Sequence, residues 1–219
     1  MQEILKMCEE TIINKLKYIP NLLSNCNIYE NDNYTTKKSP YNTSMFNIVW
    51  VKNINSNNYR NIIKEVKKIF YQNSFALWYG PSSYIKISES QFIELGFTKE
   101  ANEIGMFLNT KSINLTHYDG KKTRIHEVNN KKELMDFISV LLEYDSHVEE
   151  YFLKIYEELN FAKNTPYRYF YLTVNTQVVC IASIFFNGSF CGLFDVITVP
   201  SHRRKGYAQQ FMKFLLAFV

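Results

Sequence analysis

The stretch VPSHRRKGYA, residues 199–208, concentrates positive charge and backbone freedom between two apolar runs. Arg203, Arg204 and Lys205 are consecutive cations, and Gly206 follows them directly. The first turn of a helix leaves backbone N–H groups unpaired and carries the positive end of the helix dipole. Glycine lets an anion approach the backbone because it has no Cβ. If a helix begins here, the stretch predicts a phosphate site at its N-terminus.

The elements on both sides of this stretch must position it. Three apolar β-type runs precede it, at residues 167–174, 177–186 and 190–199. Their connectors, Asn-Thr and Asn-Gly-Ser, are typical of hairpin turns, so we predict an antiparallel meander. From about Arg204 to Val219 the pattern predicts a helix. Its expected buried face consists of Phe211, Phe214, Leu215 and Phe218.

Upstream of the meander, residues 124–128 predict a strand and two helices follow, at about 130–144 and 147–163. Capping pairs mark the starts of these helices. The pairs are Asn130 with Glu133, and Ser146 with Glu149. The polar residues 115–123 predict the main internal boundary.

The first half of the chain has an α/β pattern. A helix is expected over residues 2–18, stopped by Pro20, and a polar, turn-rich loop over 24–43. Alternating elements follow, with Ser88 and Gln91 at capping-box spacing and Gly96 as a C-terminal cap. They are strands at 45–51, 75–79 and 103–109 and helices at 58–72 and 88–97.

Composition excludes several classes. The net charge of +4 is too small for a dedicated nucleic-acid binder. The N-terminus lacks the apolar core of a signal peptide, and no apolar run approaches the roughly 18 residues that span a membrane. The four cysteines lack metal-ligand spacing, so we expect free thiols in a reducing, cytoplasmic setting and no metal site. They are Cys8, Cys26, Cys180 and Cys191.

The phrase GLFDVITVPSHRRKGYAQQF, residues 192–211, resembles the GCN5-related N-acetyltransferase (GNAT) superfamily through V-x-P-x-x-R-x-x-G-x-A between a strand and a helix. The predicted order β, α, α, β, β, β, α over residues 124–219 is similar to the first seven elements of that fold. The resemblance implies an α/β (α+β) fold, with a mixed, mostly antiparallel sheet flanked by helices and a smaller, degenerate α/β half before it. The expected domains are 1–43 (helix and loop), 44–115 (degenerate half) and 122–219 (acetyl-CoA-binding domain).

The resemblance also implies a cofactor site. Backbone groups of Val196, Ile197 and Thr198 would line the pantetheine arm of acetyl-CoA. Backbone amides after the strand would hold the pyrophosphate, with the Arg203 side chain beside them and Gln209 one step along the helix. The implied cofactor set is Val196, Ile197, Thr198, Arg203, Arg204, Lys205, Gly206, Tyr207, Ala208 and Gln209.

On the same likeness, the chemistry is attack of a neutral amine on the thioester, with the oxyanion held by a strand N–H near Val196–Thr198 and a base taking the amine proton. Asp195 is the only carboxylate on that strand, and its alternative role is a polar residue at the strand edge. Glu127, at the end of the first strand, is the second candidate base. We read His202 as a surface residue and Tyr207 as a packing residue or a cover for the cofactor.

The chain departs from the family pattern at its end. The family fold continues with a fifth strand and a helix that often carries an Asn and a Tyr acid, whereas this sequence stops at Val219. We therefore expect either a truncated form of a longer protein or a naturally shortened one. The unpaired edge of the fourth strand predicts dimerisation or aggregation. The expected activity is acetyl transfer from acetyl-CoA to a primary amine; the alternative is a catalytically silent acyl-CoA-binding or interaction module.

Overall fold

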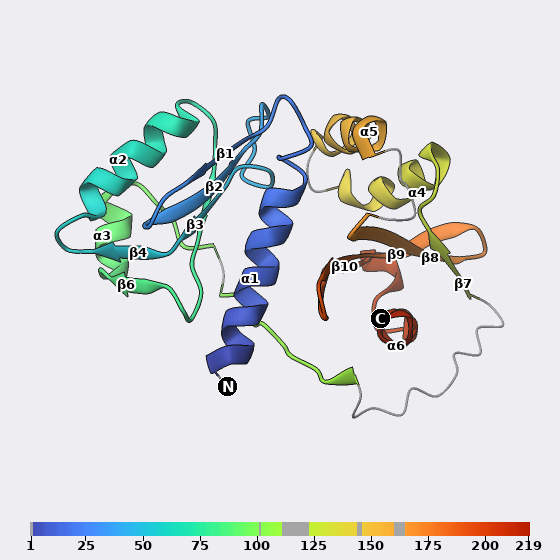
Figure 1. Ribbon diagram of the computed structural model, residues 1–219. Coiled ribbons are helices and arrows are strands. Elements are labelled where there is room, and N and C mark those ends of the chain that lie inside the picture. Colours follow the sequence, from blue (N-terminus) through green and yellow to red (C-terminus); the bar gives the residue numbers. More distant parts are fainter. Residues whose placement is uncertain (1, 101, 111–122, 144–145, 160–164) are drawn as a thin grey trace. The chain divides into compact units, whose positions relative to one another are not determined.

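The computed structural model describes residues 2–100, 102–110, 123–143, 146–159 and 165–219. The chain forms two compact units, Met1–Phe107 and Leu108–Val219 (Figure 1). The predicted boundary at 115–123 and the predicted end of the helix 147–163 fall largely outside the described residues.

The first unit contains a four-stranded sheet in the order β1-β2-β3-β5. Its first three strands are antiparallel neighbours, and β5 joins β3 in parallel. A second, two-stranded parallel sheet pairs β4 with β6. The strands are β1 (Asn27–Glu30), β2 (Tyr34–Lys38), β3 (Ile48–Val51), β4 (Asn53–Asn55), β5 (Ala76–Trp78) and β6 (Tyr84–Lys86).

Strand β3 is buried on both faces, which explains its continuous apolar sequence. Val49 and Val51 pack into the cluster that contains the apolar side of α2, and Ile48 and Trp50 pack against Leu16 of α1. The helices α1 (Gln2–Tyr18), α2 (Tyr59–Phe70) and α3 (Glu89–Glu94) confirm the helices predicted for this half. The Ser88–Gln91 capping box is formed, and Gly96 has the left-handed φ of 84° that follows a helix end.

The predicted loop at 24–43 is wrong, because β1 and β2 lie within it. Asn31 Oδ1 accepts hydrogen bonds from the amides of Asn33 (2.8 Å) and Tyr34 (3.0 Å), which shapes the connection between the two strands. Polar Thr35 and Thr36 are nevertheless buried in β2. β1 (NIYE) and β2 (YTTKK) are short and show no sustained alternation of apolar and polar residues, so the pattern that indicates a strand is missing here.

The predicted strand at 103–109 is also wrong. These residues form no regular element, and the side chains of Ile104 and Met106 are 86% and 90% exposed. A segment with alternating apolar residues forms a strand only where its backbone can pair with the edge of another strand. The structure gives these residues no such partner among those it describes.

The second unit is an antiparallel sheet in the order β10-β9-β8-β7. Its elements confirm the predicted order strand, two helices, three strands, helix. They are β7 (Thr123–Glu127), α4 (Lys131–Leu141), α5 (Val148–Leu159), β8 (Tyr167–Val174), β9 (Gln177–Asn187), β10 (Phe190–Thr198) and α6 (Tyr207–Phe218).

Helices cover both faces of this sheet, with α4 and α5 on one side and α6 on the other (Figure 1). Neighbouring residues of β8 point to opposite faces. The ring centre of Tyr169 lies 5.2 Å from that of Phe137 and 5.6 Å from that of Phe152. The ring centre of Phe170 lies 6.0 Å from that of Phe214 of α6. In this three-layer arrangement, packing against the sheet holds α6 in place after the end of β10, the strand that precedes it.

Helix α6 begins later than predicted, at Tyr207 rather than Arg204. Arg204 has a left-handed φ of 59° and Gly206 one of 82°, so the backbone is still turning there. Phe211 and Leu215 form the buried face as expected, but Phe214 is only partly buried and Phe218 is 37% exposed. At the helix end, Phe218 lies against Phe170 and the Arg168 guanidinium instead.

Candidate functional site

The loop after β10 is a tight, self-bonded turn. Residues Pro200–His202 form a single 3-10 turn, in which the His202 amide donates to Val199 O at 2.9 Å. The Arg203 side chain folds back, and its Nε donates to Thr198 O at 3.0 Å. This contact ties the first cation of the loop to the last residue of β10.

Helix α6 starts at an open N-terminus. Gly206 is its N-cap, no side chain caps it, and its first turn contains no acidic residue. No atom of the described residues lies within 4 Å of a Cβ placed on Gly206. The amides of the first turn and the positive end of the dipole therefore face an unobstructed space.

Three cations surround this helix start. Arg203, Arg204 and Lys205 are exposed, as are Ala208 and Gln209 on the first turn of α6. Exposed cations around uncapped amides form a site that suits an anion with several oxygens. The structure thus brings the predicted loop residues together at one place.

Tyr207 and His202 lie side by side at the edge of the loop. Tyr207 is partly buried, and its ring centre lies 6.0 Å from that of His202. His202 Nδ1 is 3.0 Å from Ser201 Oγ. Three residues after Tyr207, Gln210 has a buried Oε1 with no hydrogen-bond partner among the described residues.

A β-bulge interrupts β10 just before the loop. Phe194 pairs with Ser183 and Ile197 pairs with Ile181, so Asp195 and Val196 together face the single residue Ala182 of β9. Asp195 has a left-handed φ of 55°, and Val196 is 43% exposed. A bulge leaves backbone groups outside the regular ladder and re-aims side chains. The residues predicted to line a pantetheine arm, Val196 to Thr198, begin at this bulge.

The Asp195 carboxylate is held from the neighbouring strand. Ser183 Oγ donates to Asp195 Oδ2 at 2.5 Å. The Tyr167 hydroxyl is hydrogen-bonded to Ser183, and burial, with the charge of Asp195 adding to it, raises the pKa of Tyr167 well above its ordinary value. We did not single out Ser183 or Tyr167 from the sequence. A serine inside the apolar run VVCIASIFF was the available signal, because a buried hydroxyl needs a partner.

Glu127 lies elsewhere. It forms an ion pair with Arg168 of β8 through both Nε and Nη2 of the guanidinium. Its strand, β7, and the strand of Asp195, β10, are opposite edges of the sheet. Three strand spacings separate them, roughly 14 Å. The structure therefore does not bring the two candidate bases into one site.

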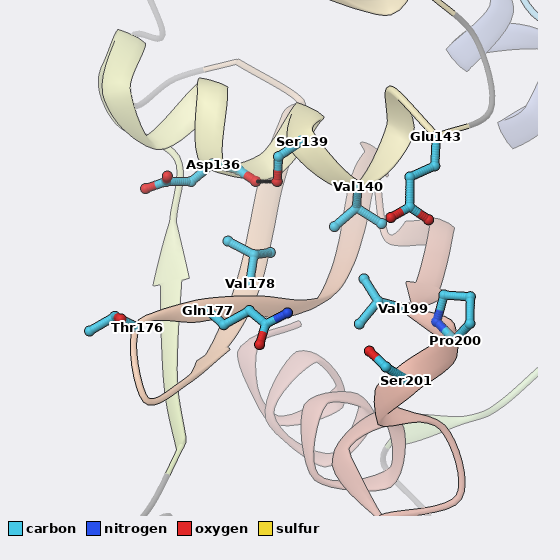
Figure 2. A pocket seen from close by; sticks show the side chains of 10 residues that line it. All are labelled: Asp136, Ser139, Val140, Glu143, Thr176, Gln177, Val178, Val199, Pro200 and Ser201. Atoms are coloured by element: carbon cyan, nitrogen blue, oxygen red, sulfur yellow. Dashed lines mark hydrogen bonds between the residues drawn. The ribbon is translucent and has the colours of Figure 1, made fainter.

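A depression of about 570 Å³ lies beside the loop, between α4 and the ends of β9 and β10 (Figure 2). Val199, Pro200 and Ser201 line it on one side, and Asp136 of α4 and Glu143, which follows that helix, on the other. Two carboxylates make this depression unfavourable for a phosphate. The turn and the start of α6 suit an anion better than this depression does.

No family model matches this sequence, and a search of the curated proteins found no match. Solved structures do match. A functionally unknown conserved protein from Staphylococcus epidermidis superposes with a TM-score of 0.62 at 17% identity, covering 90% of this chain and 81% of its own. A GCN5-related N-acetyltransferase from Kribbella flavida superposes with a TM-score of 0.63 at 10% identity, covering 96% and 80%.

The fold is GNAT-like. This confirms the predicted fold class, a mixed α/β (α+β) architecture. At such low identities the likeness concerns the fold alone, and function must be argued from the site. In the GNAT-like unit, the bulge of β10 provides backbone groups outside the regular ladder, and the start of α6 provides uncapped backbone amides. Within the described ranges, no helix has the length and apolarity needed to cross a membrane.

Proposed function

We propose that this chain is an acetyl-CoA-dependent N-acetyltransferase that acts on a primary amine. The observation that supports the proposal is the succession of bulge, basic turn and uncapped helix start in 195–208, on a GNAT-like fold. The cofactor's diphosphate matches the anion site in charge and in number of oxygens. Because acetyl-CoA is a cytoplasmic metabolite, the proposal carries a cytoplasmic location with it.

In this proposal two sets of residues in the second unit bind different parts of acetyl-CoA. The amides from Arg204 to Ala208 hold the diphosphate, with the side chains of Arg203, Lys205 and Gln209 beside it. The backbone of Val196, Ile197 and Thr198, at the open edge of β10, pairs with the pantetheine arm. Tyr207 covers the cofactor from the side of His202.

Bound acetyl-CoA supplies a thioester whose carbonyl carbon the amine attacks, so that a C–N bond forms and the C–S bond breaks. A backbone N–H at the bulge, between Val196 and Thr198, stabilises the developing oxyanion. Preorganised donors of this kind are worth about 10²–10³ in rate. The bulge favours this role because it takes its amides out of the ladder with β9.

Amine-dependent release of the CoA thiol tests the proposal. We expect thiol release from acetyl-CoA with some member of a panel of mono-, di- and polyamines, with the acetylated amine identified by mass spectrometry. Binding of acetyl-CoA without turnover of any amine would instead support the silent acyl-CoA-binding module. Absence of both binding and turnover would refute both assignments.

A further inference from the structure

A row of three polar side chains crosses the sheet of the second unit, from Tyr167 on β8 through Ser183 on β9 to Asp195 on β10. The strand register puts Tyr167 and Ser183 on one face, and at the bulge Asp195, the residue after Phe194, contacts Ser183. Ser183 is opposite Phe194 on one side and Tyr169 on the other, and Tyr167 is its diagonal neighbour. Directly opposite residues share a face, and diagonal neighbours are within reach of long side chains.

The interior end of this row is dry. Ser183 is fully buried and Tyr167 is 6% exposed. A serine hydroxyl has one proton, and Ser183 donates it to Asp195. The Tyr167 phenol must then donate to the Ser183 oxygen, and its raised pKa keeps it protonated. Both hydroxyl protons therefore point along the row toward the carboxylate.

The outer end of the row is strained. Asp195 adopts a left-handed backbone at the bulge, a sparsely populated conformation for a residue other than glycine. Such strain persists where the surroundings over-determine the conformation. A hydrogen bond from a fully buried serine is such a restraint. It fixes the carboxylate beside Val196, the first of the residues that would meet the thioester.

We propose that Tyr167 and Ser183 are positioning residues that hold the Asp195 carboxylate at the bulge as acceptor of the amine proton. The inference rests on the proposed acetyl transfer. As the C–N bond forms, the amine nitrogen becomes cationic, and its proton passes to an Asp195 oxygen. The C–S bond then breaks and the thiolate leaves; Asp195 releases the proton to water.

The row lies on the face of the sheet that α4 and α5 cover, because Ser183 is opposite Tyr169, whose ring lies against Phe137 and Phe152. From β8 the facing titratable group is the Tyr167 phenol. The residues that α4 buries are apolar, and the described charged side chains of the two helices are exposed or half-buried: Lys131, Lys132, Glu133 and Asp136 on α4, and Glu149, Glu150, Lys154 and Glu157 on α5. Lys213 belongs to α6, which covers the other face (Figure 1). Arg203 is held at Thr198 O. The Ser183 hydrogen bond is therefore the contact to remove when testing the row.

The test compares four variants for acetyl-CoA affinity, for the KM of the amine and for kcat. Asp195→Asn keeps the shape and tolerates the left-handed backbone, but removes the base. We expect it to lower kcat about 100-fold or more with acetyl-CoA affinity unchanged. Ser183→Ala and Tyr167→Phe remove hydrogen bonds that hold the carboxylate in place. We expect each to lower kcat about tenfold, with acetyl-CoA affinity and the KM of the amine unchanged.

Tyr171→Phe is the matched control. Tyr171 lies on the same face of β8, but its hydroxyl contacts Asp136 at 3.3 Å, so its loss should leave kcat unchanged. Turnover by Asp195→Asn at the wild-type rate, or wild-type kcat in both Ser183→Ala and Tyr167→Phe, would overturn the inference while the transferase stands. A wild-type chain that neither binds acetyl-CoA nor acetylates an amine would overturn the proposed function itself.

Discussion

Glu30 of the first unit is shared by two lysines. Lys17 Nζ lies 2.5 Å from Oε2 and Lys52 Nζ 2.7 Å from Oε1, and Thr35 adds a hydrogen bond at 3.0 Å. The hydrogen bonds from the two lysines lower the pKa of Glu30 from 4.5 to about 2. The three partners come from α1, β2 and the residue after β3, so this carboxylate links a helix to the sheet.

Removing that charge should weaken the first unit in a pH-dependent way. The pKa is lower in the folded state, so the contribution is complete above pH 4.5 and is lost as the pH falls toward 2. Because the side chain is 39% exposed, we expect Glu30→Gln to cost only about 0.5–1 kcal/mol at pH 7. Urea unfolding at pH 7, 4 and 2.5 should show the difference from wild type shrinking. Glu10→Gln, whose Lys6 partner is 3.8 Å away and exposed, should show none. A difference that stays constant with pH would contradict the assignment.

At this scale the sequence was informative where a residue type has one clear use. Gly206 after three cations predicted an anion site at a helix start; the structure has Gly206 as the N-cap of α6 with no side-chain cap, and anion binding there stays a prediction. The partners of Asp195 were not readable. A left-handed φ at an aspartate and a hydrogen bond to Ser183 arise only when β9 and β10 are in register.

Among the elements, the hairpin between β8 and β9 has a two-residue turn with an unfavourable residue in it. Asn175 and Thr176 have φ of 48° and 72°, the two left-handed residues of a type I′ turn. Asparagine tolerates this backbone, but a β-branched threonine does not. The β9–β10 hairpin differs, because Gly188 alone has a positive φ there.

Thr176→Gly should therefore stabilise the second unit by about 0.5–1 kcal/mol, since relief of strain exceeds the added entropy of the unfolded chain. Thermal unfolding measures it. Ser189→Gly, in the other hairpin and without a positive φ, should give no gain. A Thr176→Gly protein that unfolds at lower temperature than wild type would refute this account of the turn.

Element prediction succeeded where apolar periodicity had a partner to bury against. The runs of β8, β9 and β10 and the faces of α2 and α4 are of this kind. It failed for β1 and β2, which are mostly held by hydrogen bonds in a turn and between strands rather than by an apolar pattern. It also failed for residues 103–109, whose alternating apolar residues do not pair with the edge of any described strand. Both failures reflect pairing across the fold, which a local pattern does not contain.

At the scale of the whole molecule, the chain is two compact units, and residues 102–109, which include the boundary between them, are exposed and without regular structure. Proteases cut such segments first. Chymotrypsin should cleave near Phe107 at least about tenfold sooner than within β3 or β8–β10, giving fragments divided close to that residue. Mass spectrometry of a time course identifies them. A first cut inside the meander would contradict the division into units.

The central claim is that the start of α6 binds the diphosphate of acetyl-CoA, and calorimetric titration tests it most directly. We expect saturable binding by wild type and a loss of at least about tenfold in affinity for Gly206→Glu, because a carboxylate would enter the anion site. Gly188→Glu is the matched control, since Gly188 also has a left-handed φ of 64° and open surroundings. Its affinity should equal that of wild type. Absence of binding by wild type, or equal affinities for Gly206→Glu and wild type, would contradict the account.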